Sequence, residues 1–192
     1  MNQLEGVLLS HPDAYHSGAA AEVERLFHPA QEPSLRAGDE LELEPGVRLR
    51  CLFPPPGWRA DNADDRCAVF LLACRHTRVL LMNDAGFIAE KALLESGEDL
   101  RADILIKGLH GSDYSGLPEF INAVRPQAVV FTNTDFPITE SVSPDWKQML
   151  VNKGVRLFDQ SKTGAVIIRI EPEATTVRGY CYGAKIELKR PP

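Results

Sequence analysis

Three short apolar stretches of this 192-residue chain are each followed by side chains that can bind a metal ion. The stretches have the composition of buried strands and lie over Gly6–Ser10, Arg78–Met82 and Ala102–Ile106. The side chains that follow them are His11, Asp13 and His16, then Asp84, and then His110. Strands that end at the same rim of a sheet would bring these imidazoles and carboxylates together, and zinc and manganese accept such ligands. The sequence therefore predicts a metal site at one rim of a sheet.

The order and spelling of these motifs resemble the metallo-β-lactamase fold, in particular the C-terminal domain of ComEC-type DNA-uptake (competence) channel proteins. The motifs read SHPDAYHSGA, LLMNDAG and LIKGLHGS, where that family has stretches similar to THPDADHIGG, LLTGDA and LKVGHHGS. The similarity runs from about Leu4 to Ile170. It implies an α/β fold, the αββα sandwich of the metallo-β-lactamase type, as a single domain over residues 1–192, with 170–192 as an extra edge hairpin and tail.

The resemblance also implies a chemistry, in which two divalent ions, zinc or manganese, share a hydroxide and steady a developing oxyanion on a phosphate or carbonyl centre. By motif position, His11 and Asp13 would bind one ion and His16 would bind the other. Asp84 would bridge the two ions. Asp13 and His110 are the candidate catalytic residues, with His110 beside the metal ligands or in contact with a phosphate.

The sequence departs from the family pattern at several ligand positions. Tyr15 stands where the family has an Asp, and Leu109 where it has the first His of a pair. The later His-Pro-His-Pro stretch appears as Ser141–Pro144. The first hairpins of the family domain have no counterpart before the first motif, so we expect an N-terminally truncated version of the fold. Fewer ligands than the family uses are therefore expected here.

Three interpretations of the cluster follow from these departures. In the first it is a metal-free relic, in which the imidazoles bond to backbone groups and Asp84 caps the helix that begins near Phe87. In the second it holds one ion. The ligands would then be His11, Asp13 and Asp84, joined by His28 or His110. In the third it is a complete two-metal site in which Tyr15 ligates as a phenolate.

Three functional expectations stand beside these interpretations. The one that the departures favour is a catalytically degenerate domain that serves competence and DNA internalisation as a binding or scaffolding module. A metal-dependent hydrolase, of the phosphodiesterase or nuclease type, would need a reduced or single-metal site. A truncated product without activity would leave an apolar sheet edge uncovered. The partners expected are DNA, a membrane channel, or a second copy that covers this edge.

Charge and hydropathy narrow these expectations. The net charge is −6 and the pI about 5.4, which argues against broad binding to phosphate backbones. From Lys153 onward there are eight basic and four acidic residues, which fits a solvated sheet face or a nucleic-acid groove. No apolar run reaches the roughly 18 residues of a membrane span, so we expect the chain as written to be cytoplasmic, or a membrane-associated soluble domain if it belongs to a channel protein. The four cysteines form no Cys-x-x-Cys pair, which argues against a zinc knuckle.

Hydrophobic periodicity predicts hairpins in the middle of the chain and alternating strands and helices after it. The predicted hairpins join Leu41–Glu44 to Val47–Leu52, join Cys67–Cys74 to Arg78–Met82, join Val155–Phe158 to Ala165–Ile170, and lie within Thr175–Leu188. The predicted helices are Ala19–Phe27, Phe87–Leu94, Leu117–Val124 and Asp145–Val151. A further strand is expected at Ala128–Thr132. The Asp-rich stretch Trp58–Arg66 is expected to be a solvated loop that borders the same cleft.

Overall fold

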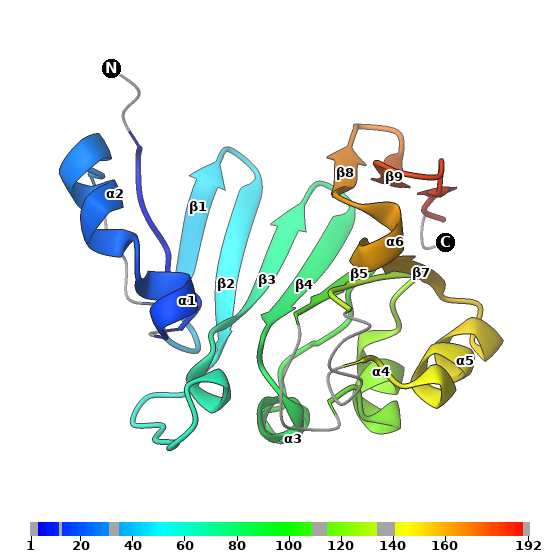
Figure 1. Ribbon diagram of the computed structural model, residues 1–192, viewed down its shortest axis with the longest axis horizontal. Helices are drawn as coiled ribbons and strands as arrows, with labels where there is room; N and C mark the ends of the chain where they lie inside the picture. The colour runs from blue at the N-terminus through cyan, green and yellow to red at the C-terminus, as the bar shows by residue number, and fades with distance from the viewer. Residues whose placement is uncertain (1–3, 12, 31–34, 109–114, 134–140, 190–192) are drawn as a thin grey trace.

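A mixed sheet forms the centre of the computed structural model, which describes residues 4–11, 13–30, 35–108, 115–133 and 141–189 (Figure 1). Its seven strands follow the order β1-β2-β3-β4-β5-β6-β7. They are β1 Glu40–Glu44, β2 Val47–Phe53, β3 Val69–Cys74, β4 Thr77–Asn83, β5 Ile104–Lys107, β6 Ala128–Phe131 and β7 Arg156–Asp159. Strands β1 to β4 are antiparallel, and β4 to β7 are parallel. The predicted α/β class is confirmed.

Three helices pack against this sheet and bury the larger part of its core. They are α3 Phe87–Glu95, α4 Pro118–Val124 and α5 Pro144–Asn152, and each contributes buried side chains to one cluster. Their most deeply buried members include Leu93, Phe120, Ile121 and Leu150. Strands β5 and β6 are almost wholly apolar because each packs on both of its faces.

A second sheet packs against the same strands through a different cluster. Its strands are β8 Val166–Ile170, β9 Thr175–Gly179 and β10 Lys185–Glu187, in the order β10-β9-β8. Val177 and Leu188 pack with Val79, Ile104 and Phe158 of the large sheet. Two sheets with helices outside the larger one are compatible with the metallo-β-lactamase-type sandwich, which remains a proposal for this chain.

The N-terminal segment lies against β2 and β3. It contains α1 Ala14–Ser17 and α2 Ala20–Phe27, drawn in blue beside β1 in Figure 1. Leu8 and Leu35 pack on a small buried cluster, whose members are Leu49, Cys51, Ala68 and Phe70. Leu72 and Leu81 join this cluster to the one beneath the second sheet. Among the described residues, no helix is long and apolar enough to cross a membrane.

Two predicted elements differ from the structure. Gly6–Ser10 is not a strand, because it pairs with no strand along its length. Only Gly6 is in a bridge, and the carbonyl of Ser10 accepts one hydrogen bond from the N–H of Ala68, the residue before β3. The hairpin of Val155–Phe158 with Ala165–Ile170 is wrong. Strand β7 pairs in parallel with β6, while β8 pairs with β9. The intervening helix α6 (Gln160–Thr163) and the left-handed Gly164, with φ of 63°, redirect the chain into the second sheet.

The predicted hairpins at β1–β2, β3–β4 and β9–β10 are confirmed, all three with antiparallel pairing. Gly46 has a φ of 82° in the first of these turns, a conformation that glycine adopts without steric cost. In the last, β9 is the central strand of the second sheet and β10 is its edge, so only half of this hairpin is an edge element.

A buried carboxylate joins the helical layer to the sheet. Glu90 of α3 is fully buried, and its oxygens accept bonds from the backbone N–H groups of Gly116 (2.6 Å) and Leu117 (2.8 Å). Its Oε1 lies 3.6 Å from Nζ of Lys107, at the end of β5. Glu90 therefore fixes the chain on both sides of the segment that carries His110.

We expect Glu90→Ala to lower the free energy of unfolding by about 3 kcal/mol, because it leaves two buried backbone donors without their acceptor and removes the carboxylate paired with Lys107. Glu95→Ala, at an exposed position of the same helix, should change it by less than about 0.5 kcal/mol. Urea unfolding of the two variants measures the difference. Equal effects would mean that the buried contacts of Glu90 contribute nothing.

Candidate metal centre

A row of hydrogen bonds brings four chain segments together at one rim of the large sheet. The N–H of Ala68 donates to the carbonyl of Ser10 (2.7 Å), and Nδ2 of Asn83 donates to the carbonyl of Ala68 (2.7 Å). The N–H of Gly108 then donates to the carbonyl of Asn83 (2.6 Å). The residues next to these in sequence therefore meet at the same rim, as the sequence predicts.

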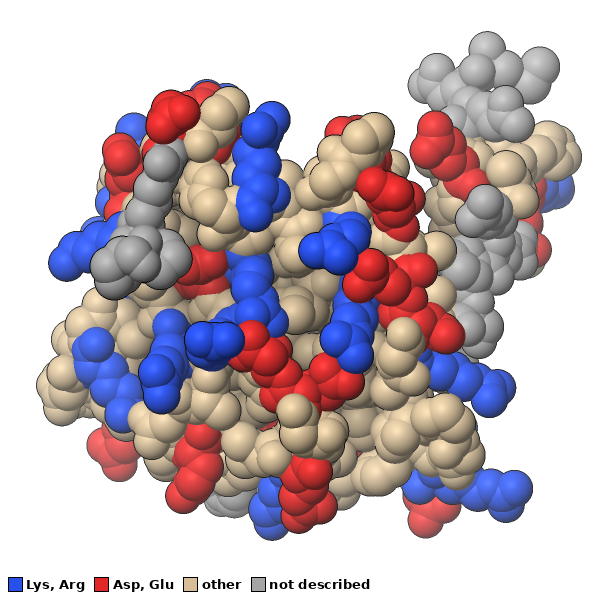
Figure 2. All heavy atoms as spheres, turned by 180° about the vertical axis from the view of Figure 1, so that it is seen from behind, with Lys and Arg blue, Asp and Glu red and all other residues tan. Residues whose placement is uncertain are grey.

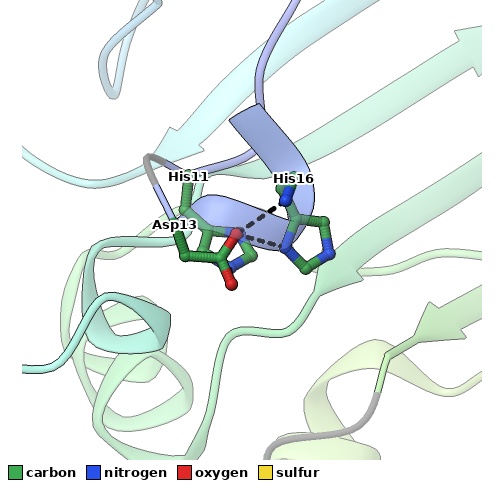
Figure 3. A group of neighbouring side chains, drawn as sticks. All are labelled: His11, Asp13 and His16. Carbon is green, nitrogen blue, oxygen red and sulfur yellow. Dashed lines mark hydrogen bonds and ion pairs between the residues drawn. The ribbon is translucent and has the colours of Figure 1, made fainter. Parts of the chain in front are cut away.

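The one-turn helix α1 sets Asp13 beside His16 (Figure 3). Asp13 is its N-cap, and Oδ1 accepts a bond from the backbone N–H of His16 at 2.8 Å. The same oxygen lies 2.7 Å from Nδ1 of His16. Residues three apart face the same side of a helical turn, so the motif spacing itself produces this contact.

His11 carries a buried ring nitrogen that lacks a hydrogen-bond partner among the described residues. Its side chain is fully buried, and Nε2 is the nitrogen concerned. Nε2 lies 3.5 Å from Oδ2 of Asp13, 3.7 Å from Oδ1 of Asp64 and 4.0 Å from Oδ2 of Asp84. These separations are too long for hydrogen bonds. A buried nitrogen with three carboxylates around it could bind a cation.

The other ring nitrogen of His11 is held from behind. Nδ1 lies 3.1 Å from Oγ of Ser10 and 3.3 Å from Sγ of Cys67. Burial raises the pKa of the Cys67 thiol to about 12, so the thiol stays neutral. Contacts of this kind orient a metal-binding imidazole and keep its other nitrogen available.

Asp84 lies between the two imidazoles. Its Oδ2 is 3.2 Å from Nε2 of His16 and 4.0 Å from Nε2 of His11, and the two rings are 4.1 Å apart between centroids. Gly108 makes room for this carboxylate, since a Cβ at position 108 would clash with Oδ1 of Asp84 and approach the Asn83 carbonyl to 2.7 Å. The bridging position that the resemblance implies for Asp84 is thus geometrically available.

Burial and neighbouring charges shift the two carboxylates in opposite directions. Burial raises the pKa of Asp84, and the carboxylates of Asp64 and Asp13 add to the rise, against the opposing effect of the imidazoles. Burial also acts to raise the pKa of Asp13, but its hydrogen bonds to His16 and the nearby imidazoles lower it overall. Ionised Asp84 therefore lowers the stability of the metal-free fold, whereas ionised Asp13 does not.

The donor set fits a divalent ion. One ligand atom from each of His11, Asp13 and His16 lies within 4.8 Å of the others. With metal–ligand bonds of about 2.1 Å in tetrahedral geometry, ligand atoms lie about 3.4 Å apart. The separations around Nε2 of His11 are close to this value or slightly longer, so small side-chain shifts suffice to close the site.

The structure brings four of the predicted site residues together. They are His11, Asp13, His16 and Asp84. His110, Leu109 and the side chain of Tyr15 lie outside the described residues. His28 ends helix α2 and does not belong to the group of possible ligands found among the described residues. Helix capping by Asp84, which the metal-free interpretation requires, is wrong, because Gly86 is the N-cap of α3 and no side chain caps it.

Asp64 is the contact that sequence reasoning missed. Its stretch was expected to be a solvated loop beside the cleft, and Asp64 instead begins the 3-10 turn η1 Asp64–Arg66 and faces His11. The only signal in the sequence was an acidic loop that directly precedes a buried strand beside the first motif.

A cavity of about 370 Å³ adjoins the buried side of His11. Its walls combine apolar side chains, such as Leu8 and Phe70, with the charged side chains of Glu24, Arg36 and Arg66. A cavity of this size accommodates a small organic group next to the cluster.

Surface charge is mixed on the face turned away from the view of Figure 1. Figure 2 shows Lys and Arg side chains interspersed with Asp and Glu across this face. Several of the described cations are paired, such as Arg50 with Glu98 (2.8 Å) and Arg101 with Asp99 (2.8 Å). Pairs of this kind indicate a solvated surface at these positions.

Comparison with known proteins adds no family name. No protein-family model matches the sequence, and no curated protein matches it. The functional argument therefore depends on the geometry of the cluster and on the motif resemblance.

We expect Asp84→Asn to raise the melting temperature of the metal-free protein at neutral pH, in the presence of a chelator. A carboxyl whose pKa is raised on folding stabilises the fold below its unfolded-state pKa, and this contribution is lost as pH rises through the folded-state value. The gain from Asp84→Asn should therefore vanish in acid. Asp13→Asn is the matched control with the opposite sign, because the pKa of Asp13 is lowered on folding. Thermal melts across the acid range measure both, and a loss of stability in Asp84→Asn at neutral pH would contradict the assigned cost.

We expect Gly108→Ala to weaken metal binding by at least about tenfold, because the added methyl group displaces Asp84. Gly97→Ala is the control, since Gly97 has a φ of 74° but open space around it. Titration with Mn²⁺, on variants shown to be folded by circular dichroism, measures the affinities. Equal losses in both variants would indicate general backbone strain and not displacement of Asp84.

Proposed function

We propose that this chain is a metallo-β-lactamase-like domain, similar to the C-terminal domain of ComEC-type proteins, that binds a divalent cation and hydrolyses phosphodiesters. The observation that carries the proposal is the buried Nε2 of His11, which faces carboxylates at 3.5–4.0 Å and has no hydrogen-bond partner among the described residues. A metal-free relic gives no reason to keep such an atom, because an unpaired buried polar group costs about 1–3 kcal/mol.

The residues of the cluster would act as ligands of the ion. His11, Asp13 and Asp84 would hold the ion, with His16, which contacts both carboxylates, as a further donor. A bound divalent ion lowers the pKa of water and stabilises the oxyanion that develops during hydrolysis. The chain holds these donors in place and leaves one side of the site accessible. The side chains of Asp13 and Asp84 are 23% and 21% exposed. Catalytic zinc sites typically keep one coordination position open for water or substrate.

A binding or scaffolding module without hydrolysis is the second candidate. Tyr15 and Leu109 favour it, because they replace two ligands that the resembled family uses. Metal binding alone does not separate the two candidates, since both allow an ion at His11. Hydrolysis separates them, and DNA, a channel protein and a second copy remain the proposed partners of either.

Elemental analysis of the purified chain should find about one divalent ion, zinc or manganese, per molecule, and His11→Ala should lose it. His28→Asn is the matched control, because it removes an imidazole outside the cluster at a left-handed position that asparagine tolerates. Metal at a thousandfold excess over its dissociation constant should stabilise the wild type by about 4 kcal/mol.

Hydrolysis of bis(p-nitrophenyl) phosphate should then depend on the same ion and be lost in His11→Ala. Metal bound without hydrolysis would favour the scaffolding candidate. A wild-type chain that neither retains nor takes up metal would overturn the proposal.

A further inference from the structure

We infer that Asp64 is an additional ligand of the cation at His11, and that the resulting donor set favours Mn²⁺ over Zn²⁺. This inference rests on the proposed function, because it concerns the same site. It goes further in naming a ligand outside the family's motifs and the kind of ion that the site selects.

The position of Asp64 matches that of the other carboxylates. Its Oδ1 lies 3.7 Å from Nε2 of His11, between the 3.5 Å of Asp13 and the 4.0 Å of Asp84. The side chain of Asp64 is 26% exposed, similar to the 23% and 21% of the other two. All three carboxylates thus converge on one buried imidazole nitrogen from three different segments of the chain.

The loop that carries Asp64 is anchored, so the contact does not depend on a chance side-chain orientation. The carbonyl of Asp64 accepts a bond from the N–H of Cys67 at 3.0 Å, which closes the turn η1. Nε1 of Trp58 donates to the carbonyl of Asp65 at 2.8 Å, and the Trp58 ring packs edge-on against Phe53 at 5.0 Å. The polar loop is therefore fastened to the core at both ends.

Bringing these three carboxylates together raises the free energy of the fold unless a cation binds between them. Three carboxylates within reach of one nitrogen repel each other in a partly buried site. A divalent cation at the centre reverses the sign of the interaction, so the geometry is one in which binding energy offsets the repulsion.

The number and type of donors indicate the ion. Asp13, Asp64 and Asp84 lie around Nε2 of His11, and His16 contacts Asp13 and Asp84. These are five possible donor side chains, whereas zinc sites in proteins usually have four ligands. Carboxylate oxygens and a coordination number near six suit Mn²⁺. The nearby thiol of Cys67 does not add a soft ligand, because its Sγ contacts Nδ1 of His11, on the far side of the ring from Nε2.

The test compares Asp64→Asn with Asp61→Asn, an exposed residue of the same loop. Asp64→Asn should lower the affinity for Mn²⁺ by about 10–100-fold and that for Zn²⁺ by less, so that the preference moves toward zinc. Asp61→Asn should leave both unchanged. Binding of Mn²⁺ is followed by electron paramagnetic resonance of the free ion, and binding of Zn²⁺ by competition, on chains whose melting curves show that they are folded. Asp64→Glu, which keeps the charge, should recover part of the affinity for Mn²⁺.

The outcomes separate this inference from the proposed function. If Asp64→Asn binds Mn²⁺ as tightly as the wild type while His11→Ala does not bind it, Asp64 is not a ligand, and the proposed function stands. An equal loss of affinity for both ions would support Asp64 as a ligand and overturn the preference for Mn²⁺. If the wild type binds neither ion, the proposed function and this inference both fail.

Discussion

The hydrogen bonds at the rim of the large sheet, from Ala68 to Ser10, from Asn83 to Ala68 and from Gly108 to Asn83, decide where every other part of the centre lies. They join the N-terminal segment to the start of β3 and the ends of β4 and β5. Each bond contributes only about 1 kcal/mol by itself. Their effect on the site is larger, because together they bring the segments that carry Asp13 and Asp84 to the buried imidazole of His11.

This arrangement exchanges stability for binding capacity. A buried nitrogen without a partner and a carboxylate whose pKa is raised by burial both reduce the stability of the metal-free fold. Active and binding sites commonly carry such costs, which the remainder of the core offsets. Here the apolar clusters on the two faces of the large sheet supply that offset, and Glu90 fixes the helical layer beside the site.

The predictable part of the centre follows from strand direction. His11, Asp13 and His16 lie within six residues of each other, and Asp84 directly follows β4, so local spacing and the shared rim determine most of their positions. The parallel pairing of β4 and β5 puts the ends of both strands at this rim. Hydrophobic periodicity is sufficient to find such strands, and the ligands then come from the residues that follow them.

The remainder depends on contacts between distant segments, which periodicity does not record. The strand predicted at Gly6–Ser10 fails because this apolar run packs against a buried cluster through Leu8 and forms no ladder with a neighbouring strand. The predicted hairpin after β7 fails because helix α6 and Gly164 send the chain to another sheet.

Asp64 escaped prediction for the same reason. Its sequence predicts a solvated loop. In the structure, Trp58 donates a hydrogen bond to the carbonyl of Asp65 and packs against Phe53, and these contacts hold the acidic loop at the edge of the site. A loop whose position only the folded core determines can therefore present a carboxylate to Nε2 of His11, beside the residues that the motif spacing places there.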